Sequence, residues 1–381
     1  PFVPEWDIGF NIAQLFLLGV TLSFILRRRS AVVIVWVAVF SLATVIAINF
    51  YFWTSLKISL PLLSPLLLIL QLAIVFIISG FIAETKNKRS ITDMFGQYVP
   101  PDHINDLIDI KKGGLDELSQ RREMSVLFSD IRSFTSLSES LSAHELSEFL
   151  NEYLSSATQI IFEHKGTIDK YVGDMVMAFW NAPLDDKDHA QNSVSAAMAM
   201  IESLTEVNET FATKNWPQVS IGIGVSTGEM NVGDMGSNFR KAYTVLGDSV
   251  NLGARLESLT KFYGVDILVS ELTKLQCHDV KFRFIDRVQV VGKNTFVDIY
   301  EPIIVGNKDV QEVDKELKLH ETAINMYQNK QWDDAQEIMK SLKNNSCLAT
   351  KVYDIYIERM ETIDQTTLAS DWSGEYTHKN K

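Results

Sequence analysis

The stretch DKYVGDMVMAFW, residues 169–180, decides how the second half of this chain folds. Two apolar, strand-like runs flank Gly173-Asp174, a pair that is typical of the turn of a β-hairpin. The same stretch places Lys170 four residues before Asp174. A salt bridge between the two would only neutralise both charges, so the pattern raises the question of whether they serve different sites.

The sequence on the N-terminal side of this hairpin predicts a strand followed by a helix. MSVLFSD, residues 124–130, is an apolar run with the length of a buried strand, and it ends at Asp130. Ser142 and Glu145 have the spacing of a capping box, so we expect a helix to begin there and to end near Gly166. The strand is expected to pair with the hairpin.

The sequence on the C-terminal side continues this alternation. After a helical stretch, VSIGIGVSTGEMNVGD, residues 219–234, is strand-like. Its apolar residues alternate with serine and with Gly222 and Gly224, so one face packs and the other permits close approach. A short strand at 243–246 then leads through a glycine into a helix that Asp248 is expected to N-cap.

The resulting order of elements is β-α-β-β-α-β with an added β-α-β at its end. It predicts an α+β domain of ferredoxin-like type, which we expect at residues 123–303. Residues 304–381 are expected to form a helical segment that resembles a single tetratricopeptide unit and ends in a polar tail. One unit cannot bury its own face, so it should pack on the preceding domain or on another chain. We expect the tail from Gln365 to be disordered.

Three apolar runs near the N-terminus, residues 8–26, 31–53 and 60–83, contain no charged residue. Each has the roughly 20 residues needed to cross a bilayer. A buried core helix is the alternative, but three such runs stand almost back to back, and a cleaved signal peptide would not be followed by two more. We therefore expect a three-span transmembrane region at residues 1–83 and a transducing linker at residues 84–122.

The basic residues predict the orientation of these spans. Arg27–Arg29 joins the first two spans and a basic cluster at 86–89 follows the third, whereas the connection between the second and third carries only Lys57. The positive-inside rule then puts everything after the third span in the cytoplasm, beneath a cell inner or plasma membrane. Because the chain begins with Pro1, we expect a further, extracytoplasmic part to precede it.

The composition narrows the class of protein further. A chain of 381 residues is long enough for two or three domains. The net charge is −13, with the acidic excess in the second half, which argues against a nucleic-acid surface. The two cysteines, Cys277 and Cys347, lack metal-ligand spacing and indicate reduced thiols in a cytosolic region.

Asp130 and Asp174 are the candidates for a metal site. Held together at the ends of paired strands, two carboxylates repel each other unless a cation lies between them. Mg²⁺ prefers one or two carboxylates together with phosphate oxygens. The turn at 131–135 follows Asp130 directly, and its backbone N–H groups suit a polyphosphate. Taken alone, these features fit a helix cap and a surface turn equally well.

A second constellation lies in TVLGDSVNLGARL, residues 244–256. Asn251 and Arg255 are four residues apart, so they share one helix face and can reach the same phosphate. The alternative is an ordinary surface helix with an exposed amide and an arginine that extends along it. Considered alone, this helix would favour the ordinary interpretation.

Together these stretches resemble the class III nucleotide cyclases in order and spacing. The resemblance covers about residues 123–302, and FGQYVPPD before it is similar to the transducer segment of membrane-bound members. The matching segments are SVLFSDIRSFT, DKYVGDMVMAFW, VSIGIGVSTGEM and YTVLGDSVNLGARLESLTKFYGVDILVS. The three spans and cytoplasmic cyclase are similar to bacterial adenylate cyclases with a CHASE-type sensory domain.

The resemblance implies roles for individual residues. Asp130 and Asp174 match the two metal-binding aspartates, with the Ile131 carbonyl as an added ligand. They would hold two Mg²⁺ or Mn²⁺ ions per active site. Asn251 and Arg255 match the pair that orients the ribose and stabilises charge at the α-phosphate.

The resemblance also implies which base is read. Lys170 matches the lysine that reads the purine edge, and its usual aspartate partner, seven residues before Asn251, is Thr244 here. One subclass that makes cyclic AMP carries this threonine, and some of its members respond to bicarbonate. Lysine donates to an acceptor such as adenine N1, whereas guanine presents an N1–H donor. ATP is therefore the expected substrate, converted to 3′,5′-cyclic AMP and pyrophosphate.

The triphosphate is expected to contact Phe134 and Thr135 in the turn, and Lys293. Many members of the family hold the triphosphate with a lysine that begins a V-K-G-K run, but Val291 takes that place here. Either Lys293 or other groups then take over the role.

In the family, the active site forms between two catalytic domains placed head to tail. One domain supplies the metal aspartates and the other supplies the residues that read the purine and stabilise the transition state. A chain with both sets predicts a symmetric homodimer, in which Lys170 and Asp174 serve different sites. A guanylate cyclase and a catalytically inactive receptor with this fold remain the alternatives.

Overall fold

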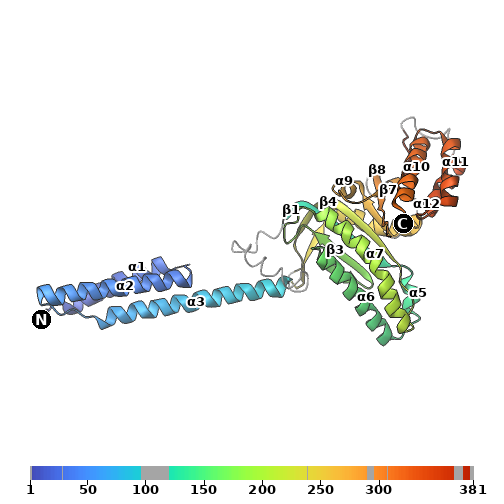
Figure 1. The fold of residues 1–381 in the computed structure, drawn as a ribbon. Coiled ribbons are helices and arrows are strands. Elements are labelled where there is room, and N and C mark those ends of the chain that lie inside the picture. Colours follow the sequence, from blue (N-terminus) through green and yellow to red (C-terminus); the bar gives the residue numbers. More distant parts are fainter. Residues whose placement is uncertain are drawn as a thin grey trace. The chain divides into compact units, whose positions relative to one another are not determined.

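The computed structural model describes residues 2–27, 29–95, 120–237, 239–289, 296–306, 308–363 and 372–377. The chain divides into two compact units, Pro1–Phe95 and Gly96–Lys381 (Figure 1). Each unit has its own core, and each is described here by itself.

The first unit is helical. It contains α1 (Asp7–Leu26), α2 (Ala31–Tyr51), the short π-helix η1 (Phe52–Leu56) and α3 (Leu63–Phe95). Three helical stretches are long and apolar enough to cross a membrane: Asp7–Leu26, Ala31–Leu56 and Leu63–Ile82. A small core joins the helices, while most of their other large apolar side chains are exposed. An apolar surface of this extent suits contact with lipid.

The third apolar helix extends well beyond the predicted span. The predicted linker begins as the last part of α3, which runs without interruption from Leu63 to Phe95. Residues 96–119 of this linker lie outside the described residues. The boundaries of the linker at residues 84 and 122 stay predictions.

The second unit is built on one mixed sheet with the order β2-β3-β1-β4-β6-β8-β7-β9, and β5 also pairs with β4. Antiparallel pairing of β1 with both β3 and β4, after the crossovers through α6 and α7, confirms the predicted ferredoxin-like arrangement. The strands are β1 (Gln120–Ile131), β2 (Thr167–Val172), β3 (Met175–Trp180), β4 (Ile221–Gly236), β5 (Lys241–Leu246), β6 (Ile267–Ser270), β7 (Phe282–Gln289), β8 (Phe296–Pro302) and β9 (Glu375–Thr377).

Helices cover both faces of this sheet. The helices of the domain are α5 (Phe134–Ser138), α6 (Ala143–Glu163), α7 (His189–Thr213), α8 (Asp248–Tyr263) and α9 (Glu271–Leu275). α6 and α7 lie side by side (Figure 1) and share a core with Leu127 of β1. α8 packs on the opposite face, because its Gly253 lies against Val126 and Phe128.

Two local predictions illustrate how the helices are placed. The capping box of α6 is confirmed: Ser142 and Glu145 each bond to the other's backbone N–H. The prediction that Asp248 caps α8 is wrong, because the N-cap is Gly247 and Asp248 is the first helical residue. A Cβ at Gly247 would lie 3.2 Å from the carbonyl oxygen of Glu229, so the cap position has little room for a side chain.

The glycines of β4 bring α8 close to the sheet, as the alternation in the sequence predicts. A Cβ at Gly224 would lie 2.2 Å from the backbone nitrogen of Glu257 and 2.3 Å from the carbonyl oxygen of Gly253. A Cβ at Gly222 would lie 2.4 Å from Thr260 Oγ1. The helix backbone therefore rests directly on the strand.

The described residues of the C-terminal segment form three helices rather than a single helix pair: α10 (Val310–Gln328), α11 (Trp332–Asn345) and α12 (Lys351–Thr362). The segment packs on the preceding domain, which is one of the two expected arrangements, because α10 and α12 share a core with α8, β7 and β8. The prediction of a disordered tail is wrong for residues 372–377, because β9 pairs in parallel with β7.

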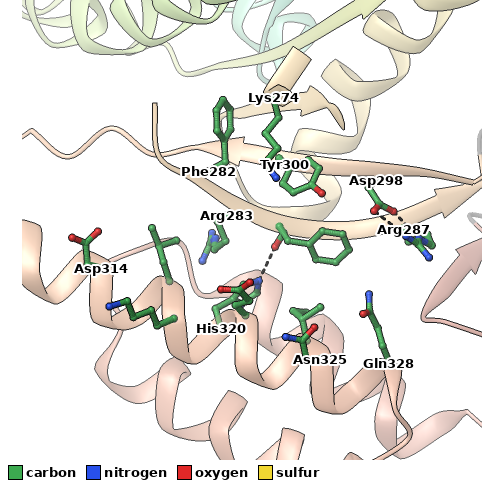
Figure 2. Close-up of a pocket in the computed structure, with 15 residues that line it drawn as sticks. Lys274, Phe282, Arg283, Arg287, Asp298, Tyr300, Asp314, His320, Asn325 and Gln328 are labelled. Atoms are coloured by element: carbon green, nitrogen blue, oxygen red, sulfur yellow. Dashed lines mark hydrogen bonds and ion pairs between the residues drawn. The ribbon is translucent and has the colours of Figure 1, made fainter. Parts of the chain in front are cut away.

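A cavity of about 500 Å³ lies where α10 meets β7 and β8 (Figure 2). His320 Nε2 donates a hydrogen bond to the backbone carbonyl of Phe284 at 2.6 Å, and Arg287 binds both carboxylate oxygens of Asp298 at 2.6 and 3.0 Å. The cavity thus belongs to the contact between the sheet and the C-terminal helices. The boundary between them at residues 303 and 304 stays a prediction.

Candidate active site

Two carboxylates meet at one end of the central strands. Asp130 is the penultimate residue of β1, and Asp174 lies in the turn between β2 and β3. Because β1 pairs with β3, this turn lies beside the end of β1, and the backbone N–H of Ile131 donates to Asp174 Oδ2 at 3.1 Å. The structure therefore places together the three residues expected to hold metal.

The electrostatics of this pair are unfavourable without a cation. Burial, a hydrogen bond with Asp174 and the negative charges of Asp174 and Glu257 raise the pKa of Asp130 to about 7. Burial also raises the pKa of Glu257, which approaches the pair from α8. Three acids are thus held near one another by the fold, at a place where a positive charge would relieve their repulsion.

The donor set fits a hard divalent cation with few protein ligands. In the described part of the chain, no three His, Cys, Asp or Glu side chains form a group that could hold a metal ion by themselves. Two carboxylates and the carbonyl of Ile131 leave further positions for phosphate oxygens and water, which is how Mg²⁺ is usually bound. The residues therefore suit a metal that arrives with a phosphorylated ligand.

A second cluster lies where β5 meets β2. Lys170 Nζ lies 3.5 Å from Thr244 Oγ1 and 3.2 Å from Asp169 Oδ1. Thr244 in turn donates its hydroxyl proton to Asp169 Oδ2 at 2.5 Å. The opening question is answered within one chain: Lys170 pairs with Asp169 and Thr244, whereas Asp174 contacts Ile131 and Asp130.

The remaining predicted residues lie on α8 and on the turn after β1. Asn251 is exposed and Arg255 is partly buried, and neither side chain has a hydrogen bond or ion pair with another described residue. Phe134 and Thr135 begin α5, where backbone N–H groups have no partner within the helix. Lys293 lies outside the described residues.

The family of the domain follows from comparison with known proteins. Residues 117–300 match the family model described as the adenylate and guanylate cyclase catalytic domain. The chain contains a class III nucleotide cyclase domain. The predicted cyclase fold is confirmed, and the predicted family with it.

Two curated relatives of this cyclase domain are adenylate cyclases. Adenylate cyclase 1 of Rhizobium meliloti is 36% identical over 210 residues, which cover 55% of this chain and 31% of the relative. An adenylate cyclase of Anabaena cylindrica is 35% identical over 232 residues, 58% of this chain and 44% of the relative. The chain therefore spans less than half the length of either relative.

Among solved structures, the adenylyl cyclase CyaB of P. aeruginosa is 34% identical, with a TM-score of 0.46. The match covers 50% of this chain and 98% of that one. The family as a whole includes both adenylate and guanylate cyclases, so membership does not by itself decide the purine.

Two acids of the cyclase domain's site were missed in the sequence. Asp169 stands directly before Lys170, and in a regular strand neighbouring side chains point to opposite faces. Glu257 stands two residues after Arg255, and residues with this spacing lie on different sides of a regular helix. The only sequence signal was their position inside the matching segments; their contacts across the sheet were not visible there.

Proposed function

We propose that the protein is a membrane-anchored adenylate cyclase that converts ATP to 3′,5′-cyclic AMP and pyrophosphate at the interface of a homodimer. The observation that carries the proposal is the meeting of Lys170 with Thr244, two residues far apart in sequence, away from the carboxylate pair. The lysine donates to an acceptor such as adenine N1, whereas guanine has an N1–H donor there. The cluster therefore favours adenine.

The carboxylate pair supplies the other half of the chemistry. Asp130, Asp174 and the Ile131 carbonyl would hold two Mg²⁺ or Mn²⁺ ions. When bound, such ions lower the pKa of a coordinated hydroxyl and neutralise phosphate charge. The raised pKa of Asp130 supports this assignment, because the cation would replace the proton that this carboxyl retains near neutral pH.

The side chains of α8 would position the substrate for in-line attack. Asn251 orients the ribose, and Arg255 meets the negative charge that develops at the α-phosphate. The 3′-hydroxyl of the ribose gives its proton to water, and its oxygen forms a bond to the α-phosphorus. The bond from that phosphorus to the oxygen that bridges to the β-phosphate breaks, which releases pyrophosphate. Catalysis rests mainly on positioning and electrostatic stabilisation. Phe134 and Thr135 would contact the triphosphate through their backbone N–H groups.

A homodimer would complete the site. Asn251 and Arg255 have no side-chain partners among the described residues, which is expected if they face a substrate held by a second copy. Large apolar side chains are also exposed beside Lys170 and Thr244, which with Asp169 form what we call the purine cluster: Tyr171 and Val172 on β2 and Leu246 at the end of β5. A head-to-tail pair would cover this surface and create two equivalent sites.

The N-terminal unit would anchor the dimer to the membrane. Its three apolar helices have the length and composition of membrane spans. The basic residues that join the first two spans and follow the third support a cytoplasmic catalytic domain, under the inner or plasma membrane.

The first test is product analysis with the purified full chain. We expect cyclic AMP from ATP and Mn²⁺, with much less cyclic GMP from GTP. Preferential cyclic GMP formation would instead establish the guanylate cyclase, and no product from either triphosphate would establish the inactive receptor.

The second test addresses the shared site. Asp130→Ala and Arg255→Ala chains should each be inactive, and co-expressed chains should regain activity because one intact site forms in each mixed dimer. Mixed dimers isolated with two affinity tags provide the measurement, and unmixed dimers of each variant are the control. Mixed dimers that assemble and stay inactive would exclude shared sites.

A further inference from the structure

A β-bulge brings Asp169 to the purine cluster. In the pairing of β2 with β3, Ile168 lies opposite Ala178 and Lys170 lies opposite Met177, so Asp169 is an extra residue in β2. In a regular strand, Asp169 and Lys170 would point to opposite faces. The bulge re-aims the chain, and both side chains reach Thr244 of β5.

The Asp169 carboxylate is buried and surrounded by donors. It is 5% exposed, and it accepts a hydrogen bond from the Thr244 hydroxyl, while the backbone N–H of Val245 also favours the negative charge. Its other oxygen forms an ion pair with Lys170 whose alignment is poor for a hydrogen bond. Burial raises the pKa of Asp169, and these donors oppose that rise. The geometry that favours the ionised form is the Lys170 ammonium at 3.2 Å from one oxygen and the Thr244 hydroxyl, which donates to the other.

The carboxylate determines what Thr244 can offer to a ligand. A hydroxyl has one proton and two lone pairs, and an ionised carboxylate can only accept. Because Thr244 gives its proton to Asp169 at 2.5 Å, its oxygen retains only acceptor capacity. The Lys170 ammonium can only donate, and its nitrogen lies 3.5 Å from the same hydroxyl oxygen. The cluster therefore presents one acceptor and one donor side by side.

We propose that Asp169 is a specificity-determining residue that selects adenine by fixing the Thr244 hydroxyl as an acceptor beside the Lys170 donor. This inference rests on the proposed function. Adenine carries an N6 amino donor next to the N1 acceptor, which matches the pair. Guanine carries an O6 acceptor next to an N1–H donor, so both contacts would be mispaired. Asp169 touches no substrate atom in this account and acts through Thr244 and Lys170.

The test is the Asp169→Asn variant of the full chain. The asparagine oxygen is expected to face Lys170, which leaves the amide N–H₂ against Thr244 and frees the hydroxyl proton to donate. We expect the ratio of kcat/KM for ATP over inosine triphosphate, which has O6 and N1–H, to fall about 10- to 100-fold, the size of one mispaired buried hydrogen bond. The change should lie mainly in KM, with kcat at saturating ATP much less affected.

Thr244 variants separate this role from a merely structural one. Thr244→Ser keeps the hydroxyl and should keep the preference for ATP, whereas Thr244→Val should lose it. In a Thr244→Val background, Asp169→Asn should have no further effect on the ratio, because its action passes through the hydroxyl. If Asp169→Asn fails to fold, the serine and valine variants decide the question: a valine variant with unchanged preference for ATP overturns the proposal.

Different results would refute the role of Asp169 and the proposed adenylate cyclase activity. A wild-type chain that prefers ATP, with an Asp169→Asn variant of equal preference and equal thermal stability, refutes only the role of Asp169. A wild-type chain that prefers GTP refutes the adenylate cyclase itself.

Discussion

Two aspartates of the cyclase domain, the fully buried Asp286 and the partly buried Asp130, differ in the charge of the groups that surround them. Asp286 is fully buried and accepts hydrogen bonds from the hydroxyl of Tyr263 and from Arg359 Nη2, each at 2.5 Å, and from the backbone of Arg287 at 2.8 Å. Asp130 instead has two acids as neighbours, Asp174 and Glu257.

The comparison shows that the groups around an acid indicate whether it holds the fold together or awaits a ligand. The donors around Asp286 come from α8, β7 and α12, so that carboxylate joins the C-terminal helices to the helix that carries Arg255. The acids around Asp130 repel it, and the fold holds them together nevertheless. A carboxylate that the chain leaves without a cation indicates a ligand from outside the chain.

The largest expected effect is on activity at the acidic pair. Asp174→Asn should lower kcat/KM for ATP about 1,000-fold or more, because a metal ligand is lost and the amide cannot replace its charge. The free energy of unfolding should stay constant or rise slightly, since one repulsion disappears. Cyclic AMP assays and thermal unfolding measure the two effects. A variant that loses stability as well as activity would show that Asp174, like Asp286, stabilises the fold.

The converse is expected at the structural acid. Arg359→Met leaves Asp286 buried without its cation, which should lower the free energy of unfolding by about 3 kcal/mol or more. Chemical denaturation of the full chain gives this value, and hydrogen exchange should show that α12 loses protection. Glu358→Gln, an exposed neighbour on the same helix, is the matched control and should leave both unchanged. An equally stable Arg359→Met variant would show that Asp286 needs no cation.

The response to pH and metal should also distinguish the pair. The folded-state pKa of Asp130 is raised from 3.8 to about 7, so without metal the folded chain binds an extra proton between these values and loses stability as pH rises through the window. Mn²⁺ competes with that proton, so it should raise the melting temperature more at pH 8 than at pH 6. Asp130→Asn should abolish this difference; a variant that still shows it would place the metal elsewhere.

The smallest expected effect is at the contact of α10 with β7. Burial lowers the pKa of His320 to about 3 in the folded chain. Below the ordinary pKa of 6.5 the unfolded chain binds a proton that the folded chain does not, so the free energy of unfolding decreases as the pH decreases. Between pH 7.5 and pH 5.5, this histidine should lower the free energy of unfolding by about 1.4 kcal/mol, because the unfolded chain becomes almost fully protonated at this position. His320→Gln should lose less stability than the parent over this range, measured by denaturation at both pH values. An equal loss would assign the acid sensitivity to other groups.

Local chemistry explains which parts of the fold the sequence predicts. The hairpin turn at Gly173, the capping box of α6 and the glycines of β4 each depend on a few adjacent residues whose conformational or steric preferences are strong. The order of strands and helices follows from such signals, and the pairing of β1 with β3 then brings Asp130 to Asp174.

Contacts between distant segments explain what the sequence missed. The cap of α8 fell on Gly247 because β4 leaves little room there, and the tail formed β9 because β7 offered an edge for pairing. Asp169 joined the purine cluster only through a bulge, and Glu257 joined the acids only because α8 rests on glycines.

By itself the sequence determined the order of the elements, the three apolar helices and the segments that match the family, because each is encoded within one short stretch. Only the tertiary structure decided which neighbours each charge receives. It gave Asp286 a complete set of donors, Asp130 two other acids and Thr244 a fixed acceptor role. The physical reason is that a buried charge is governed by groups within a few ångströms, and these come from strands and helices far apart in the chain.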